Sequence, residues 1–183
     1  MDSLALEVLD YWFGEGPEYG KRHKRWFEKD PAFDAEIRAR FMPLYEAQLA
    51  GRQWLGEARA CLARIIVLDQ FPRNMFRGAP RAFASDALAL EAARHAVAQG
   101  YDRGMLAVER MFVYLPFEHS EALADQERAC ELMRPLGEEQ CRYAARHHEI
   151  IRRFGRFPHR NSILGRESTP EEIEFLEQPG SGF

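Results

Sequence analysis

The sequence of 183 residues is poor in three features that mark common protein classes: paired cysteines, lysine and long apolar runs. Its three cysteines, Cys61, Cys130 and Cys141, form no C-x-x-C pair, which argues against a disulfide framework and against a zinc ribbon. No apolar run approaches the roughly 20 residues of a membrane-spanning helix. Residues 1–13 also lack the basic start and the cleavage site of a secretion signal. We therefore expect a cytoplasmic protein with no membrane segment.

Lysine occurs only at positions 21, 24 and 29, so every other cationic side chain is an arginine. A guanidinium group is planar and permanently charged, and it pairs with carboxylate or phosphate through two parallel hydrogen bonds. The net charge of −4 gives no general reason to expect nucleic acid or an anionic membrane as a partner. An arginine cluster in this chain would instead favour a small anion.

The pattern of apolar residues predicts an all-α fold. Apolar positions recur at helical spacing along most of the chain, and no alternating strand pattern between hairpin turns is present. The length fits one domain, 1–183. We predict N-terminal helices within 1–51, a central five-helix array over 54–154, and a C-terminal loop, short helix and tail over 155–183. The five central helices are predicted at 54–70, 80–99, 104–114, 120–136 and 138–154.

Three segments contain a proline after an apolar or aromatic residue: 65–81, 115–121 and 155–161. Proline lacks a backbone donor and disfavours helical geometry in the residue before it, so Pro72 and Pro116 are expected to end helices. Ser120 is then a candidate cap for the next helix. Short connections favour antiparallel neighbours, so the loops after the first, third and fifth central helices should emerge at the same end of the array.

This shared end predicts a candidate site rich in polar side chains. Arginines would hold a phosphate or carboxylate group, and a histidine with a neighbouring carboxylate would move protons. The predicted ligand-binding residues are Asp69, Arg73, Asn74, Arg77, Arg110, Arg156, Arg160 and Asn161, and the predicted catalytic residues are Glu118, His119 and His159. The hypothesis is a protein that binds a small anionic molecule, with its reaction left open.

Each of these residues also has a structural interpretation. Arginine, asparagine and aspartate near a helix end can cap it or pair locally, and the remaining arginines can lie on a solvated face. Glu118 and His119 can be hydrogen-bonded beneath a proline turn. A zinc site made from Glu118, His119, His147 and His159 would lack the i, i+4 spacing of a helical metal pair. We predict no metal and no cofactor.

Several phrases of the sequence together resemble one uncharacterised, largely bacterial family, the domain of unknown function numbered nine-two-four. They are VLDYWFG (8–14), LDQFPRNMFRG (68–78), LPFEHSE (115–121), RFGRFPHRN (153–161), LGR (164–166) and STPEE (168–172). The resemblance covers nearly the whole chain. It implies a fold similar to tetratricopeptide repeats, built from stacked antiparallel helix pairs, and it implies no activity and no catalytic residues.

A repeat-like fold supports a second hypothesis, in which the protein is a peptide or protein interaction module and the proline segments are purely structural. The tail PGSGF (179–183) differs by one residue from the PGSSF associated with the family. Docking of Phe183 into a groove is an alternative to a frayed end.

Overall fold

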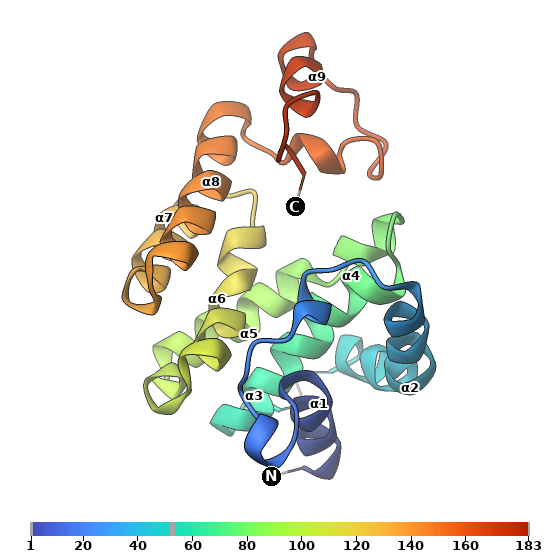
Figure 1. Cartoon of the computed structure of the whole chain (residues 1–183), viewed down its shortest axis with the longest axis vertical. Helices are drawn as coiled ribbons and strands as arrows, with labels where there is room; N and C mark the ends of the chain where they lie inside the picture. The colour runs from blue at the N-terminus through green and yellow to red at the C-terminus, as the bar shows by residue number, and fades with distance from the viewer. Residues whose placement is uncertain (1, 52–53, 183) are drawn as a thin grey trace. The chain divides into compact units, whose positions relative to one another are not determined.

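The computed structural model describes residues 2–51 and 54–182, and Phe183 lies outside this described part (Figure 1). Every regular element in these ranges is helical, which confirms the all-α prediction. None of the helices there has the length and apolar character needed to cross a bilayer. The backbone forms two compact units: unit 1 contains the described residues of 1–77 and 81–116, and unit 2 those of 78–80 and 117–183. The single domain and the repeat-like stacking stay predictions.

Unit 1 contains five helices and most of a sixth. Helix α3 packs against α1 and α5, and α2 packs against α4. The Asp2 and Asp30 carboxylates accept backbone N–H groups at the start of α1 and α2 and so cap these helices. The helices are α1 (Ser3–Phe13), α2 (Pro31–Leu49), α3 (Ala58–Ile65), α4 (Phe71–Met75), α5 (Asp86–Ala98) and α6 (Ala107–His119), the last of which ends in unit 2.

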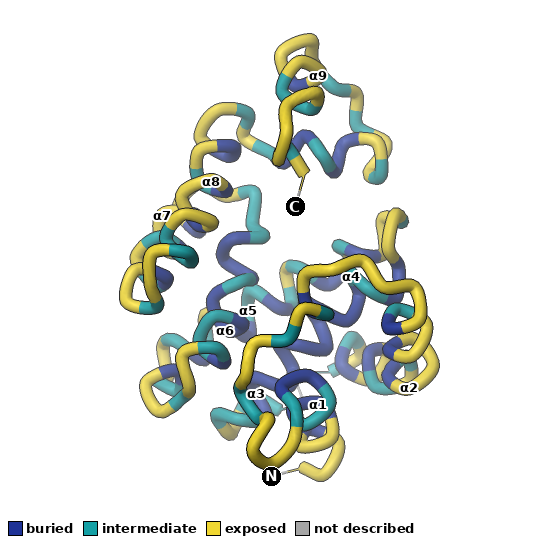
Figure 2. Tube along the Cα trace, in the orientation of Figure 1, coloured by how far each residue is buried: buried dark blue, intermediate teal, exposed yellow. Residues whose placement is uncertain are grey.

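Aromatic rings fill the centre of unit 1, where the buried tube segments gather in Figure 2. Trp12 and Phe13 of α1 each meet Phe112 of α6 edge-on, with 5.5 Å between ring centroids. Trp12 also meets Phe71 of α4 at 5.8 Å. All four side chains are fully buried, and edge-to-face pairs of this kind stabilise a core beyond their buried area. The core therefore joins α1, α4 and α6.

The prediction that Pro72 ends a helix is wrong. The helical backbone continues from α3 through a π-helical turn, Ile66–Gln70, into α4, and Phe71 has helical dihedrals of φ −57° and ψ −41°. Pro72 cannot donate to the carbonyl of Leu68, four residues earlier. The Ser85 hydroxyl donates to that carbonyl instead, at 2.6 Å. The wider π turn accommodates the proline ring, and a side chain from another segment replaces the missing donor.

Pro116 also lies within a helix, because α6 extends to His119. The predicted end of this helix at residue 114 is therefore corrected. Ser120 is not the N-cap of the next helix, which begins at Leu123 after Ala122. The Ser120 hydroxyl instead accepts the Ala122 N–H at 3.2 Å and donates to Asp125 at 2.7 Å. Ser120 therefore orders the turn before the helix rather than the helix start itself.

Unit 2 contains the end of α6 and three further helices, α7 (Leu123–Met133), α8 (Glu138–Phe154) and α9 (Pro170–Leu176). Helices α7 and α8 lie side by side (Figure 1). The predicted bounds 138–154 are confirmed for α8, and Gly155 ends it in the left-handed conformation at φ 68°. Thr169 and Glu172 form a capping box at the start of α9, as the local sequence STPEE (168–172) favours. Local sequence signals were sufficient for these features.

Candidate functional site

In unit 1, the predicted site residue Arg73 is bound by carboxylates of the protein itself. Its guanidinium donates to both oxygens of Asp86, at 2.9 and 3.1 Å, and lies 3.3 Å from Asp69. Asp69 is fully buried and also accepts from the Gln70 amide at 2.6 Å. These bonds neutralise a buried carboxylate and link α4 to the first turn of α5. Arg73 is therefore a structural cation in this arrangement.

Asn74 and Arg77 meet at a second carboxylate, Asp34 of α2. The Asn74 amide donates to it at 2.7 Å, and Arg77 donates through two nitrogens at 2.7 and 2.8 Å. Burial raises the pKa of Asp34, but these hydrogen bonds outweigh burial and lower the pKa below its usual value. The structural interpretation thus accounts for the contacts of both residues.

Arg110 belongs to a separate network. Its Nε donates to the Tyr114 hydroxyl at 3.2 Å, and that hydroxyl donates to the buried Asp102 at 2.6 Å. This chain connects two turns of α6 with the segment before it.

In unit 2, Arg156 and Asn161 both bind Glu172. Arg156 donates through two nitrogens at 2.6 and 2.8 Å, and the Asn161 amide donates at 3.3 Å. Glu172 also accepts the Thr169 N–H at 2.8 Å as part of the capping box. The bond from Arg156 is the largest of several effects that lower the pKa of Glu172 to about 2. The capping box was visible in the sequence, but these further partners of Glu172 were not.

Replacing Glu172 with alanine is expected to lower the free energy of unfolding by about 1–2 kcal/mol, because the cap of α9 is lost. Replacing the adjacent Glu171, an exposed residue paired with Arg153, should change it by less than about 0.5 kcal/mol. Urea denaturation of the two variants measures the difference. Equal losses of unfolding free energy in the two variants would show that Glu172 stabilises the protein no more than an exposed surface charge does.

The remaining predicted residues of unit 2 gather around one ring. Phe157 is fully buried and is contacted by three side chains that carry or can carry positive charge. Ring centroids are 5.7 Å apart for His147 and 5.6 Å apart for His159, and the Arg160 guanidinium carbon lies 4.6 Å from the Phe157 ring centroid. We call these four residues, together with Glu118 and His119, the Phe157 cluster. Cations over an aromatic face are attracted by its electron density.

Glu118 and His147 form a buried pair at the edge of this cluster. A Glu118 oxygen lies 3.4 Å from His147 Nδ1, which is also 2.9 Å from the Tyr143 carbonyl. A carbonyl oxygen can only accept, so Nδ1 carries a proton. In the neutral ring, Nε2 is then the nitrogen that can accept a further proton. This pair places a carboxylate beside an imidazole, two groups that can each take up or release a proton.

Burial and nearby charges keep His147 and His159 neutral near pH 7. Burial lowers the pKa of His147 to about 3, although Tyr143 and Glu118 favour the charged ring, and the charges of His119, His159 and Arg160 act in the same direction as burial. Burial, followed by the charge of Arg160, lowers the pKa of His159 to about 4. His119 lowers the pKa of both rings, which places it within electrostatic range of each. The cluster is thus a mutually repelling set of potential cations.

A second ion pair fixes the backbone of Phe157. Arg166 donates to both oxygens of Glu121, at 2.8 and 3.0 Å, and to the Phe157 carbonyl at 3.0 Å. Glu121 accepts the Phe157 N–H at 2.8 Å. Sequence reasoning assigned no site role to Glu121 or Arg166, although both lie in phrases that carry the family resemblance, 115–121 and 164–166.

The structure therefore brings Glu118, His119, His159 and Arg160 together in unit 2. It places the other predicted residues in three separate carboxylate networks and one tyrosine network. The meeting of all three proline segments at one end stays a prediction, because those segments are divided between the two units. Within residues 2–51 and 54–182, no group of three His, Cys, Asp or Glu side chains is positioned to hold a metal ion.

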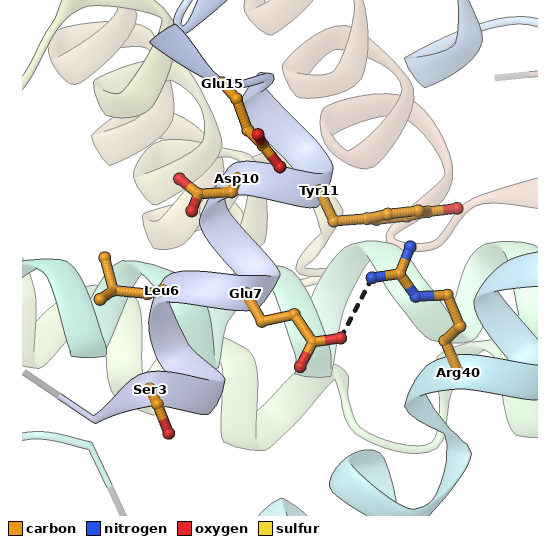
Figure 3. A pocket seen from close by; sticks show the side chains of 7 residues that line it. All are labelled: Ser3, Leu6, Glu7, Asp10, Tyr11, Glu15 and Arg40. Atoms are coloured by element: carbon orange, nitrogen blue, oxygen red, sulfur yellow. Dashed lines mark hydrogen bonds and ion pairs between the residues drawn. The ribbon is translucent and has the colours of Figure 1, made fainter.

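One surface concavity of about 350 Å³ lies in unit 1, lined by Ser3, Leu6, Glu7, Asp10, Tyr11, Glu15 and Arg40 (Figure 3). Its carboxylates would repel an anion. A cation would meet Arg40, which pairs with Glu7 at 3.1 Å and lies over the Tyr11 ring at 4.6 Å. The protein thus supplies its own cation here, and the Phe157 cluster is the stronger candidate site.

Comparisons with known proteins identify a family and a fold. Residues 8–180 match the model of the family described as bacterial protein of unknown function (DUF924). The solved structure of a protein of unknown function from Agrobacterium tumefaciens is similar to this chain, with 44% sequence identity and a TM-score of 0.86, and the match covers 96% of this chain and 97% of that one. No curated protein matches the chain. The chain belongs to the bacterial DUF924 family.

Proposed function

We propose that this protein binds a small carboxylate or phosphate at the Phe157 cluster. The observation that carries the proposal is the set of three cationic or protonatable side chains around one buried ring, at 4.6 to 5.7 Å. Arg160 itself is only 7% exposed. The Arg160 guanidinium is a permanently charged donor of the kind that binds carboxylate and phosphate groups.

The cluster also has members that solvent can reach. His119 and His159 are partly exposed, whereas His147 and Arg160 are buried. An anion could therefore approach from the side of His119 and His159 and contact Arg160 in a region of low dielectric constant. Charge-assisted hydrogen bonds are stronger in such a region than in water.

The proposed site contains fewer residues than the site predicted from the sequence, in which arginines from all three proline segments would line one pocket. Arg73, Arg77 and Arg156 each donate two hydrogen bonds to a carboxylate of the protein. An anionic ligand would have to displace those carboxylates. The Glu118–His147 pair gives the cluster a means of moving a proton, and we assign no reaction to it.

The test is calorimetric titration of the protein with inorganic phosphate, sulfate and malonate. Replacing Arg160 with methionine, which keeps a stem to pack on Phe157, is expected to weaken binding at least tenfold, as loss of a charged hydrogen bond does. Arg160→Lys should weaken it less, because the charge remains while the planar fork is lost.

Arg152 provides the matched control, since it lies on α8 and pairs only at the surface with Glu149. Arg152→Gln should bind like the wild type. Circular dichroism establishes that each variant is folded. Absence of binding by the wild type, or equal binding by Arg160→Met, would contradict the proposal and leave the peptide-interaction hypothesis as the alternative.

A further inference from the structure

The charges around Phe157 balance when its histidines are neutral. The positive groups facing these rings are Arg160 and Arg166, and the negative groups are Glu118 and Glu121, which gives two of each sign. The four charged groups lie at the end of α6, in the turn after it and within residues 157–166, while α8 contributes the neutral ring of His147. An arriving anion would therefore add uncompensated negative charge.

Little of that charge can be compensated by rearranging existing pairs. Glu121 and Arg166 bind each other through two hydrogen bonds and also hold the Phe157 backbone. Arg156, the nearest further arginine in sequence, is bound by Glu172. A charge that is buried without compensation is strongly unfavourable, as the large loss on removing one partner of a buried pair shows. Protonation of a histidine supplies the missing positive charge without moving the chain.

We infer that the Phe157 cluster is a proton-coupled anion site, in which binding of the anion transfers one proton from solvent to the ring of His159. This inference rests on the proposed function. In the balanced step, a neutral ring, an anion and a proton from solvent give an imidazolium–anion pair, and no other bond is formed or broken.

His159 is assigned this proton for two reasons. Its ring lies beside Phe157 next in sequence to Arg160, and it is partly exposed, whereas His147 is only 7% exposed. Burial penalises a new charge less at the more exposed ring. A bound anion would also offset the repulsion from Arg160 that disfavours a charge on His159 in the free protein.

The coupling makes affinity depend on pH. Uptake of one proton means that the dissociation constant falls as pH falls, by up to tenfold per pH unit. This steep range lies above the pKa of about 4 that His159 has in the free protein.

Sulfate is the suitable probe, because it does not itself take up protons near neutral pH. Titration of the full chain with sulfate in two buffers of different ionisation enthalpy should show uptake of about one proton per sulfate bound. The affinity should also rise between about pH 7.5 and 5.5. His159→Gln should still bind sulfate through Arg160, with little proton uptake and a flat pH profile, while Arg152→Gln should behave like the wild type.

The outcomes separate this inference from the proposed function. Binding with equal heats in both buffers would overturn proton coupling and leave anion binding standing. If His159→Gln takes up as many protons per bound sulfate as the wild type, the assignment of the proton to His159 is wrong. If no anion binds at any pH, the proposed function itself fails, and the coupling fails with it.

Discussion

Replacement of Arg73 with methionine is expected to lower the free energy of unfolding by about 3–5 kcal/mol, the usual cost of removing one partner from a buried charge pair. Asp69 has no exposed surface, and without Arg73 its buried charge would lose the guanidinium that lies 3.3 Å away. Asp86, at the start of α5, would lose both of its bonds to the guanidinium. Chemical denaturation measured against the wild type gives the loss directly.

Arg77→Met is the matched control, because Arg77 lies in the same segment and also donates two bonds to one aspartate. Its side chain is 38% exposed, however, and Asp34 keeps its bond from Asn74. The expected loss is about 1 kcal/mol or less, which is typical of exposed pairs. Equal losses in the two variants would show that burial of Asp69 does not set the cost.

Acid is expected to destabilise the protein before its carboxylates titrate. The pKa values of His147 and His159 in the folded state, about 3 and 4, lie below the ordinary histidine value of 6.5. As pH falls through 6.5 the unfolded chain binds protons that the folded chain does not, so stability is lost from pH 6.5 downwards. Each ring contributes up to about 1.4 kcal/mol per pH unit, so the two together should cost roughly 3 kcal/mol between pH 6.5 and 5.

The carboxylates with lowered pKa values, such as Glu172 and Glu121, act in a lower window. Their contribution is present above their ordinary pKa of 4.5 and is lost only as pH falls below it. Urea denaturation between about pH 7.5 and 5 therefore isolates the histidines. The double variant His147→Gln/His159→Gln should show a much flatter profile. If the free energy of unfolding of the wild type does not change over this pH range, the two histidines are not buried in a neutral form.

Local signals in the sequence predicted the helices well where the neighbouring residues decide the structure. Helix α8 and its Gly155 end, and the capping box of α9, depend on residues within a few positions of each other. The course of the chain at Pro72 could not be predicted in this way. Its helix continues because Ser85, from another segment, supplies the donor that proline lacks, and only the tertiary structure determines that contact.

The same reason limited the prediction of the site. The sequence indicated arginines as anion ligands but not the carboxylates that already bind them: Arg156 and Glu172 are 16 residues apart, and Arg77 and Asp34 are 43 apart. His147 lies on the apolar face of its helix and is buried, as that face indicates. Its role in the Phe157 cluster follows from Glu118 and Phe157, which other segments contribute.

The π-helical turn Ile66–Gln70 also determines where the side chains after it point. Each residue of an α-helix advances the direction of its side chain by about 100°, so one additional residue in a turn rotates everything downstream by that angle. In an uninterrupted α-helix, Arg73 would therefore point in a different direction relative to the residues of α3, which precede the turn. The π turn thus determines the rotation of α4 about its own axis. That rotation in turn determines which neighbouring helices the side chains of α4 can contact.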